Sequence, residues 1–270
     1  MPLLDPLAGL SAWALLPFVA FWLCVFLERL APPHQSHPRD GTGEWVMNLA
    51  GLAMQGCVVP LAGYLIAVHV LAPTLAPISG VWAIGFWGAF LLNVLAVDLL
   101  YYVQHRAFHQ RQLWPWHQAH HAAPRVSVWA TSRNTIWTHF VFVYFLLNPW
   151  LAALTDSPEG FFAGAMLTAA LDCWRHSRID WAKLGLDGPL RIASLLIITP
   201  AAHHRHHADG LAVANFGANF SLWDRLFGTY AESHGLPERY QPQTSPPLWH
   251  QFWWPWRTQS AREEKADVST

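Results

Sequence analysis

Histidines recur in this chain at spacings typical of metal-binding sites. Of its 16 histidines, eight fall into three motifs: His105-x-x-x-His109, His117-x-x-His120-His121 and His203-x-x-His206-His207. Spacings of three and four residues place imidazoles on one face of a helix, where they can chelate a cation. A tetrahedral zinc site uses about four ligands, so eight donors predict two metal ions sharing one cage.

Four further residues have types and positions suited to the same site. His176 follows an apolar stretch and is a candidate ninth ligand. Asp98 lies two helical turns before His105 inside an apolar run, where a carboxylate is costly and usually functional. We expect it to accept a hydrogen bond from an imidazole and fix its tautomer. Asp224 is a second candidate anion to offset the metal charge. His204 interrupts the third motif, and we expect it to be a bystander or to lie behind a ligand.

The predicted donor set favours iron. All-nitrogen ligation in a lipid environment is compatible with a redox-active metal, and two iron ions with dioxygen as co-substrate are the cofactors we expect. Zinc binds nitrogen ligands more tightly than ferrous iron does. Overexpressed protein is therefore expected to take up zinc as well.

The composition indicates a membrane protein. Hydrophobic residues make up 53% of the chain and charged residues 12%, about half the charged fraction of a soluble domain. The net charge of −1 offers no basic surface for nucleic acid. The three cysteines lie in apolar stretches without CxxC spacing and are expected to be free thiols.

The hydropathy pattern predicts an all-α membrane protein. Four to five helices are expected to cross the bilayer, with a cytoplasmic helical cap that carries the histidine motifs. A bilayer core of about 30 Å takes roughly 20 helical residues. The candidate stretches are Leu7–Leu30, Val46–Leu71, Val81–Val103, Ile136–Leu154 and Ser157–Trp174, the last of which is short. Segment Leu190–Ile198 is too short to span and is expected to be interfacial or buried.

Basic residues predict the orientation. With the segment after the first span inside, all 16 lysines and arginines fall on one side, and Ala72–Gly80 forms a loop on the other. The three histidine motifs then face the cytoplasm. We expect a multi-pass protein of a bacterial inner membrane, or of the endoplasmic reticulum if the source is eukaryotic.

Three regions are expected along the chain. Residues 1–80 would hold the first spans, and residues 81–235 the catalytic domain. Residues 236–270 would hold an interfacial aromatic segment, Leu248–Trp256, and a charged, frayed tail, Ala261–Thr270.

From Asp98 to Thr229 the sequence resembles the fatty acid hydroxylase/sterol desaturase superfamily of integral-membrane di-iron enzymes. The resemblance rests on an Asp-x-x-x-Tyr-x-x-His-Arg-x-x-His element starting at Asp98, on both H-x-x-H-H motifs and on the lone His176. It also includes Asn215-Phe-Gly and the segment Trp223–Thr229. An Arg-x-His-Pro-like stretch common in the family matches only at Arg133. This departure leaves the substrate class open rather than the metal site.

The resemblance implies an enzyme that hydroxylates or desaturates a C–H bond of a lipid such as a fatty acyl chain or sterol. It uses dioxygen and electrons from a separate donor, a ferredoxin or cytochrome type with its reductase. Two alternatives remain at this stage, a zinc-dependent membrane hydrolase and a non-catalytic metal-binding membrane protein. Against the first, no histidine motif contains the general-base carboxylate of an H-E-x-x-H site.

Overall fold

Helices make up the regular structure of this chain. The computed structural model describes residues 7–35, 37–240 and 247–253, and within these residues no strand forms, only three isolated bridges. This confirms the all-α prediction. The longer helices are α1 (Leu7–Leu30), α2 (Thr42–Ala53), α3 (Val59–Ile66), α5 (Gly85–Leu91), α6 (Asp98–Phe108), α9 (Val143–Leu154) and α10 (Pro158–Arg175).

Two long rods are built from several of these helices. Wider turns η2 (Met54–Val58) and η3 (Ala67–Leu71) join α2, α3 and α4 (Ala72–Leu75), and the rod ends with η4 (Ala76–Ile78). The segment η5 (Leu92–Val97) joins α5 to α6 in the same way. The predicted loop Ala72–Gly80 is therefore mostly helical, because the apolar sequence continues to Ile78 and only Ser79–Gly80 turns the chain.

Three helices are long and apolar enough to cross a membrane: Ala12–Leu30, Thr42–Ile78 and Gly85–Phe108. Only 6% of the most apolar window of Thr42–Ile78 is buried inside the protein, so its side chains are available to lipid. The predicted count of four to five spans is not confirmed. Stretch Ile136–Leu154 is divided at Phe142, whose extended backbone separates α8 (Thr138–Val141) from α9.

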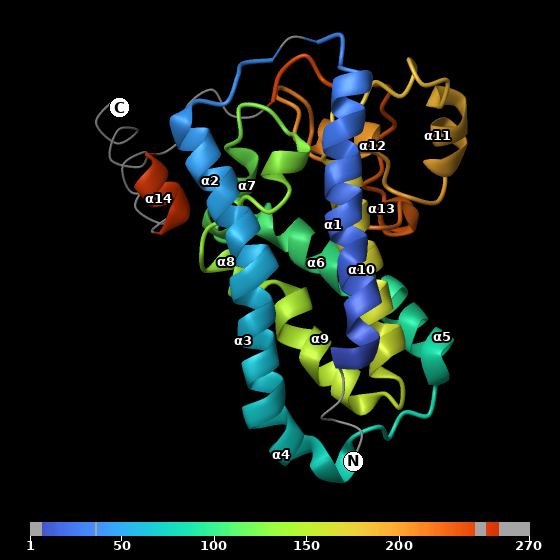
Figure 1. The fold of residues 1–270 in the computed structure, drawn as a ribbon. Coiled ribbons are helices and arrows are strands. Elements are labelled where there is room, and N and C mark those ends of the chain that lie inside the picture. The colour runs from blue at the N-terminus through green and yellow to red at the C-terminus, as the bar shows by residue number, and fades with distance from the viewer. Residues whose placement is uncertain (1–6, 36, 241–246, 254–270) are drawn as a thin grey trace.

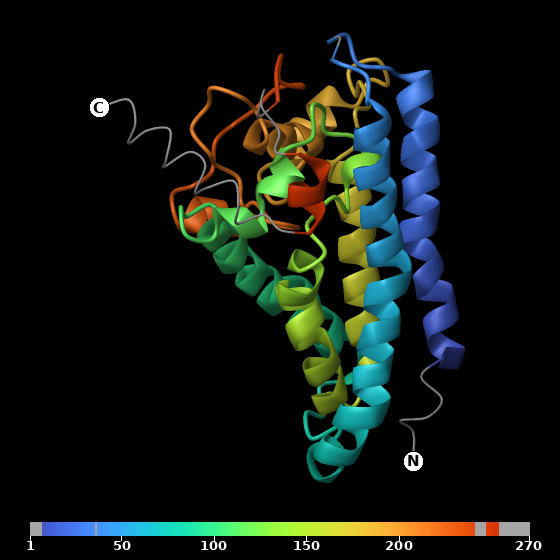
Figure 2. The same cartoon turned by 90° about the vertical axis from the view of Figure 1, so that its left-hand side faces the viewer.

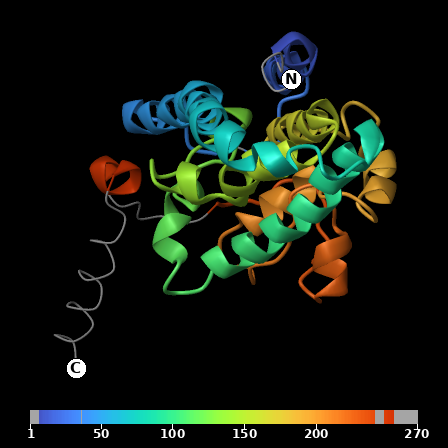
Figure 3. The same cartoon turned by 90° about the horizontal axis from the view of Figure 1, so that it is seen from below.

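Helix α10 is the centre of the bundle. It packs along α1 and against α5 (Figures 1 and 3). Gly160 and Gly164 face α5, where a Cβ atom at Gly160 would overlap the backbone of Phe86. Small residues four apart allow such close approach between membrane helices. Helix α10 ends at Arg175, and His176 follows directly as its C-cap residue. The packing of α10 in the bundle therefore sets the position of His176.

Short elements and loops form a cap at one end of the rods (Figure 2). They are η6 (Trp114–Trp116), α7 (Gln118–His121), η7 (Val128–Ala130), α11 (Asp187–Ala193), α12 (Pro200–His206), α13 (Leu222–Leu226) and α14 (Leu248–Phe252). Helix α11 contains no buried residue, whereas Ile198 at the end of the predicted segment Leu190–Ile198 is buried. The end of the predicted aromatic segment and the tail, residues 254–270, lie outside the described residues.

Candidate metal centre

The ends of four helices bring the nine predicted ligands together. Helix α6 carries His105 near its C-terminal end and stops at His109, and α10 stops at His176. The second motif lies on and beside α7, with His117 at its N-cap. The third motif occupies α12, which Thr199 caps by accepting a hydrogen bond from the backbone N–H of Ala202. Segments separated by up to 102 residues thus meet in one place.

The nine rings form two groups. Ring nitrogens within each group lie within 4.8 Å of one another. We call them group A, with His105, His109, His117, His121 and His206, and group B, with His120, His176, His203 and His207. Group A has one partly exposed member, His109, and the remaining eight rings are buried. The second and third motifs each contribute to both groups, so the two groups are neighbours.

The hydrogen bonds of His120 and His176 leave two ring lone pairs facing each other. Nδ1 of His120 lies 3.1 Å from the carbonyl oxygen of Arg133, and Nδ1 of His176 lies 2.9 Å from that of Asp172. Because a carbonyl only accepts, both protons reside on Nδ1 and each Nε2 presents a lone pair. These two Nε2 atoms face each other at 3.4 Å. Two lone pairs at this distance repel, so the donor set of group B fits a metal ion.

In group A, a backbone carbonyl fixes one ring of each facing pair. Nδ1 of His105 donates to the carbonyl of Phe216 at 2.7 Å, and Nδ1 of His206 donates to that of Ala214 at 2.8 Å. Their Nε2 lone pairs point toward other rings: Nε2 of His105 is 2.9 Å from Nε2 of His117, and Nε2 of His206 is 3.2 Å from that of His121. Backbone carbonyls thus fix the tautomers of both rings, as is usual for metal-bound histidine.

Burial favours the neutral form of most of these imidazoles. Burial lowers the pKa of His109 to about 2, and neighbouring His206 adds to the effect. Burial also lowers the pKa of His120 and His206 to about 3. It holds the pKa of His121, His203 and His207 well below the ordinary value. Neutral imidazole is the form that binds metal, so the rings are ready to ligate at neutral pH.

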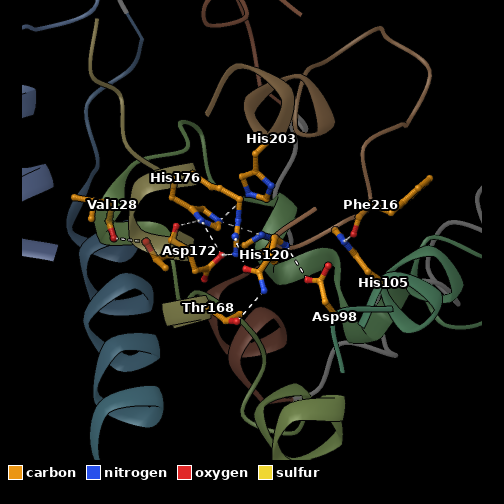
Figure 4. Close-up of polar contacts among 12 residues, drawn as sticks. Asp98, His105, His120, Val128, Thr168, Asp172, His176, His203 and Phe216 are labelled. Carbon is orange, nitrogen blue, oxygen red and sulfur yellow. Dashed lines mark hydrogen bonds and ion pairs between the residues drawn. The ribbon is translucent and has the colours of Figure 1, made fainter. Parts of the chain in front are cut away.

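Asp98 contacts the segment after the third motif rather than an imidazole. Its carboxylate accepts hydrogen bonds from the backbone N–H of Asn219 at 2.8 Å and from the indole N–H of Trp223 at 2.9 Å. Figure 4 shows the position of Asp98. The expected bond from Asp98 to an imidazole is therefore wrong. Seven helical residues separate Asp98 from His105 by about 10 Å along the axis, which is more than a carboxylate side chain can reach.

Asp224 holds the loop that contacts group A. It accepts from the backbone N–H groups of Phe216 and Gly217, both at 2.8 Å. The ring of Phe216 contacts three rings of group A: His105, His109 and His206. The backbone explains the residue types of the Asn215-Phe-Gly motif. Asn215 adopts a left-handed conformation with φ 60°, which asparagine tolerates better than most residues. A Cβ at Gly217 would overlap the carbonyl of Phe220.

His204 faces away from both groups. Its Nδ1 lies 2.6 Å from the hydroxyl of Tyr240, and its Nε2 lies 3.0 Å from the carbonyl of Ser177. Both ring nitrogens are thus engaged by protein groups, and His204 belongs to neither group of converging nitrogens.

Two residues near the centre were not assigned a role from the sequence. A carboxylate oxygen of Asp172 lies 3.4 Å from Nδ1 of His176 and 2.9 Å from Nη2 of Arg175 (Figure 4). The four-residue spacing of Asp172 and His176 was the available signal. Arg133 is fully buried, donates to the carbonyl of Ala119 within the second motif, and pairs with Glu44. No local sequence pattern predicts these contacts of Arg133.

Comparisons with known proteins agree with this centre. A sequence model of the fatty acid hydroxylase family matches residues 90–229, which include all nine rings. The chain belongs to the fatty acid hydroxylase family. No solved structure matches it.

Two curated relatives of this fatty acid hydroxylase family member are named for lipid substrates. The chain is 30% identical over 226 residues to the ornithine lipid hydroxylase OlsE of Rhizobium tropici, and the match covers 77% of this chain and 63% of that protein. It is 27% identical to the fatty acid hydroxylase vlmA of Lecanicillium sp over 74% of this chain and 56% of that protein. A very-long-chain aldehyde decarbonylase, GL1-1 of Oryza sativa subsp. indica, is 31% identical over 52% of this chain and 23% of its own length. The chain thus spans less than two thirds of each relative.

Proposed function

We propose that this protein is a membrane-bound di-iron oxygenase that hydroxylates, or desaturates, a C–H bond of a lipid. The observation that carries the proposal is the convergence of nine imidazoles in two adjacent groups, with the ring lone pairs of His120 and His176 facing each other. Bound iron would supply dioxygen activation and C–H oxidation. Hydroxylation of RH to ROH consumes one O₂, two electrons and two protons and releases water.

In this proposal the chain's own residues bind and orient. Groups A and B would each hold one metal ion, and burial of the rings would exclude water from most of their surroundings. Asp98 and Asp224 would act through the segment 215–223, which they hold by its backbone N–H groups. We place the electrons' source in a separate protein of the ferredoxin or cytochrome type. The predicted regions 1–80, 81–235 and 236–270 and the cytoplasmic orientation of the motifs belong to the same proposal.

The relatives' names support a lipid as the substrate class. Ornithine lipid is the first substrate to test, because OlsE is 30% identical over most of this chain. The zinc hydrolase alternative is not favoured by the family or by the motifs, which contain no general-base carboxylate.

The decisive experiment combines metal analysis with lipid analysis. The protein would be purified in lipid discs, loaded anaerobically with ferrous iron and supplied with a reductase, a ferredoxin and ornithine lipid or phospholipid. We expect two iron ions per chain, oxygen consumption that requires reductant, and a lipid product that gains one oxygen atom or loses two hydrogens. One metal ion per chain, or lipid cleavage by zinc-loaded protein without oxygen, would overturn the proposal.

A further inference from the structure

Six large apolar side chains are exposed together on one side of the cap. They lie on α11, on the segment that follows it and on and just after α13: Ile192, Leu195, Leu196, Leu222, Leu226 and Phe227, between 47% and 72% exposed. We call this surface the α11–α13 patch. Soluble surfaces rarely gather so many large apolar side chains without a binding partner.

Hydrogen bonds hold the two halves of the patch together. Figure 1 shows α11 and α13 at the same end of the molecule. The backbone N–H of Ser221 donates to the carbonyl of Leu196 at 3.0 Å. The hydroxyl of Ser221 and the guanidinium of Arg225 both donate to the carbonyl of Ser194, at 2.9 and 3.1 Å. The apolar side chains therefore belong to one surface rather than to two independent loops.

The depth of α13 follows from its contacts with a candidate membrane span. Trp223 on α13 donates to Asp98 at 2.9 Å, and Phe227 stacks on Tyr102 with ring centroids 5.4 Å apart. Both partners lie in Gly85–Phe108. A hydrocarbon core of about 30 Å takes about 20 helical residues and, if it starts at Gly85, ends near residue 104. Asp98 then lies about 9 Å below that boundary, and α13 is attached at this depth.

The same helix presents apolar side chains to its surroundings. Leu100 and Val103 of α6 are 43% and 53% exposed, as expected for side chains that face lipid. The α11–α13 patch is thus attached to a helix with a lipid-facing side, at a depth where lipid is present. The guanidinium of Arg225 donates to the carbonyl of Ser194 and lies 3.7 Å above the ring of Tyr230, so protein groups partner this charge.

We propose that the α11–α13 patch is inserted into the bilayer leaflet on the histidine-motif side, with lipid as its partner. The carboxylate of Asp224 on α13 holds Phe216 against group A, while Leu222 and Leu226 on the same helix are exposed. One five-residue helix therefore separates lipid from the candidate metal centre. This inference concerns membrane contact and stands whether or not the proposed reaction is correct.

Site-specific quenching tests the insertion. In a Cys57→Ser background, which removes the exposed native thiol, Leu196→Cys and Leu226→Cys would be labelled with bimane and reconstituted into phosphatidylcholine/phosphatidylglycerol vesicles. Some vesicles would carry brominated acyl chains, which quench bimane on contact. We expect both labels to be quenched to the same extent as one at Val103→Cys in the span.

Leu211→Cys is the matched control, because Leu211 is an exposed apolar residue of the cap outside the patch. Leu211 lies two residues after Asp209, whose backbone N–H donates to the carbonyl of Arg239. The neighbouring Tyr240 contacts the ring of His37, in the loop that follows α1. We expect no quenching at Leu211. Labels at Leu196 and Leu226 that behave like the one at Leu211 would overturn the proposal, as would disulfides between Leu226→Cys residues of two chains. Monodispersity and metal content verify folding, and the optical readout needs no catalytic activity.

Discussion

Asp172 and His176 lie one helical turn apart at the end of α10, with a carboxylate oxygen of Asp172 3.4 Å from Nδ1 of His176. The backbone carbonyl of Asp172 lies 2.9 Å from the same nitrogen. Two acceptors therefore fix the proton on Nδ1 and aim Nε2 at group B. A negative carboxylate behind a ligating imidazole also increases its basicity. Asp172, rather than Asp98, thus has the geometry expected of a carboxylate that supports a ligand.

Replacing this carboxylate should weaken the centre. We expect Asp172→Asn to lower metal affinity or turnover by about 10–100-fold, the range typical of groups hydrogen-bonded to ligating histidines. Competition with a chelator and iron analysis of the purified protein would measure the affinity. Asp187→Asn, which breaks an exposed ion pair with Arg191 on α11, is the control. Wild-type affinity in Asp172→Asn would contradict the role.

His203 and His204 are adjacent in sequence but should respond differently. His203→Ala removes a ring of group B and should lose one metal equivalent together with activity. His204→Ala should keep both metals, because its ring bonds Tyr240 and Ser177 instead. It should nevertheless be destabilised by about 1–3 kcal/mol, since the buried hydroxyl of Tyr240 and the carbonyl of Ser177 each lose a hydrogen bond. Metal stoichiometry and thermal unfolding of both variants test this. Loss of metal from well-folded His204→Ala would contradict it.

The neutral histidines predict an acid-sensitive apo-protein. Burial lowers the pKa of His109 to about 2 and that of His120 to about 3, against about 6.5 in the unfolded chain. Between these values the unfolded state binds more protons, so the stability of the metal-free protein should fall as the pH drops from about 6.5 toward 3. Thermal unfolding at a series of pH values measures the slope. His120→Gln should reduce it, and an unchanged slope would argue against a neutral, buried His120.

Gly217 should not tolerate a side chain. A Cβ atom there would overlap the carbonyl of Phe220, so Gly217→Ala must shift the loop that holds Phe216 against His105. We expect a cost of about 1–3 kcal/mol from overpacking and a larger relative loss of turnover than of stability. Gly188→Ala on α11 is the control, because nothing lies within 4 Å of its added Cβ. Equal behaviour of the two variants in unfolding and turnover assays would refute the packing argument.

The sequence by itself determined the local part of this structure. Helical spacing placed His105 and His109 on one helix end and predicted the two H-x-x-H-H motifs as chelating elements, since residues three and four apart are neighbours on any helix. Apolar runs located α1 and the rods near their observed positions. The same logic could have found Asp172, four residues before His176.

Only the tertiary structure decided which distant groups meet. Asp98 pairs with Asn219 across 121 residues, His120 bonds the carbonyl of Arg133 rather than a carboxylate, and each H-x-x-H-H motif is divided between groups A and B. Periodicity fixes the direction in which a side chain leaves its helix, but the packing of α10 against α5 and the path of the loop 215–223 fix what it reaches. The candidate ligands could therefore be read from the sequence, whereas their grouping and supporting partners required the fold.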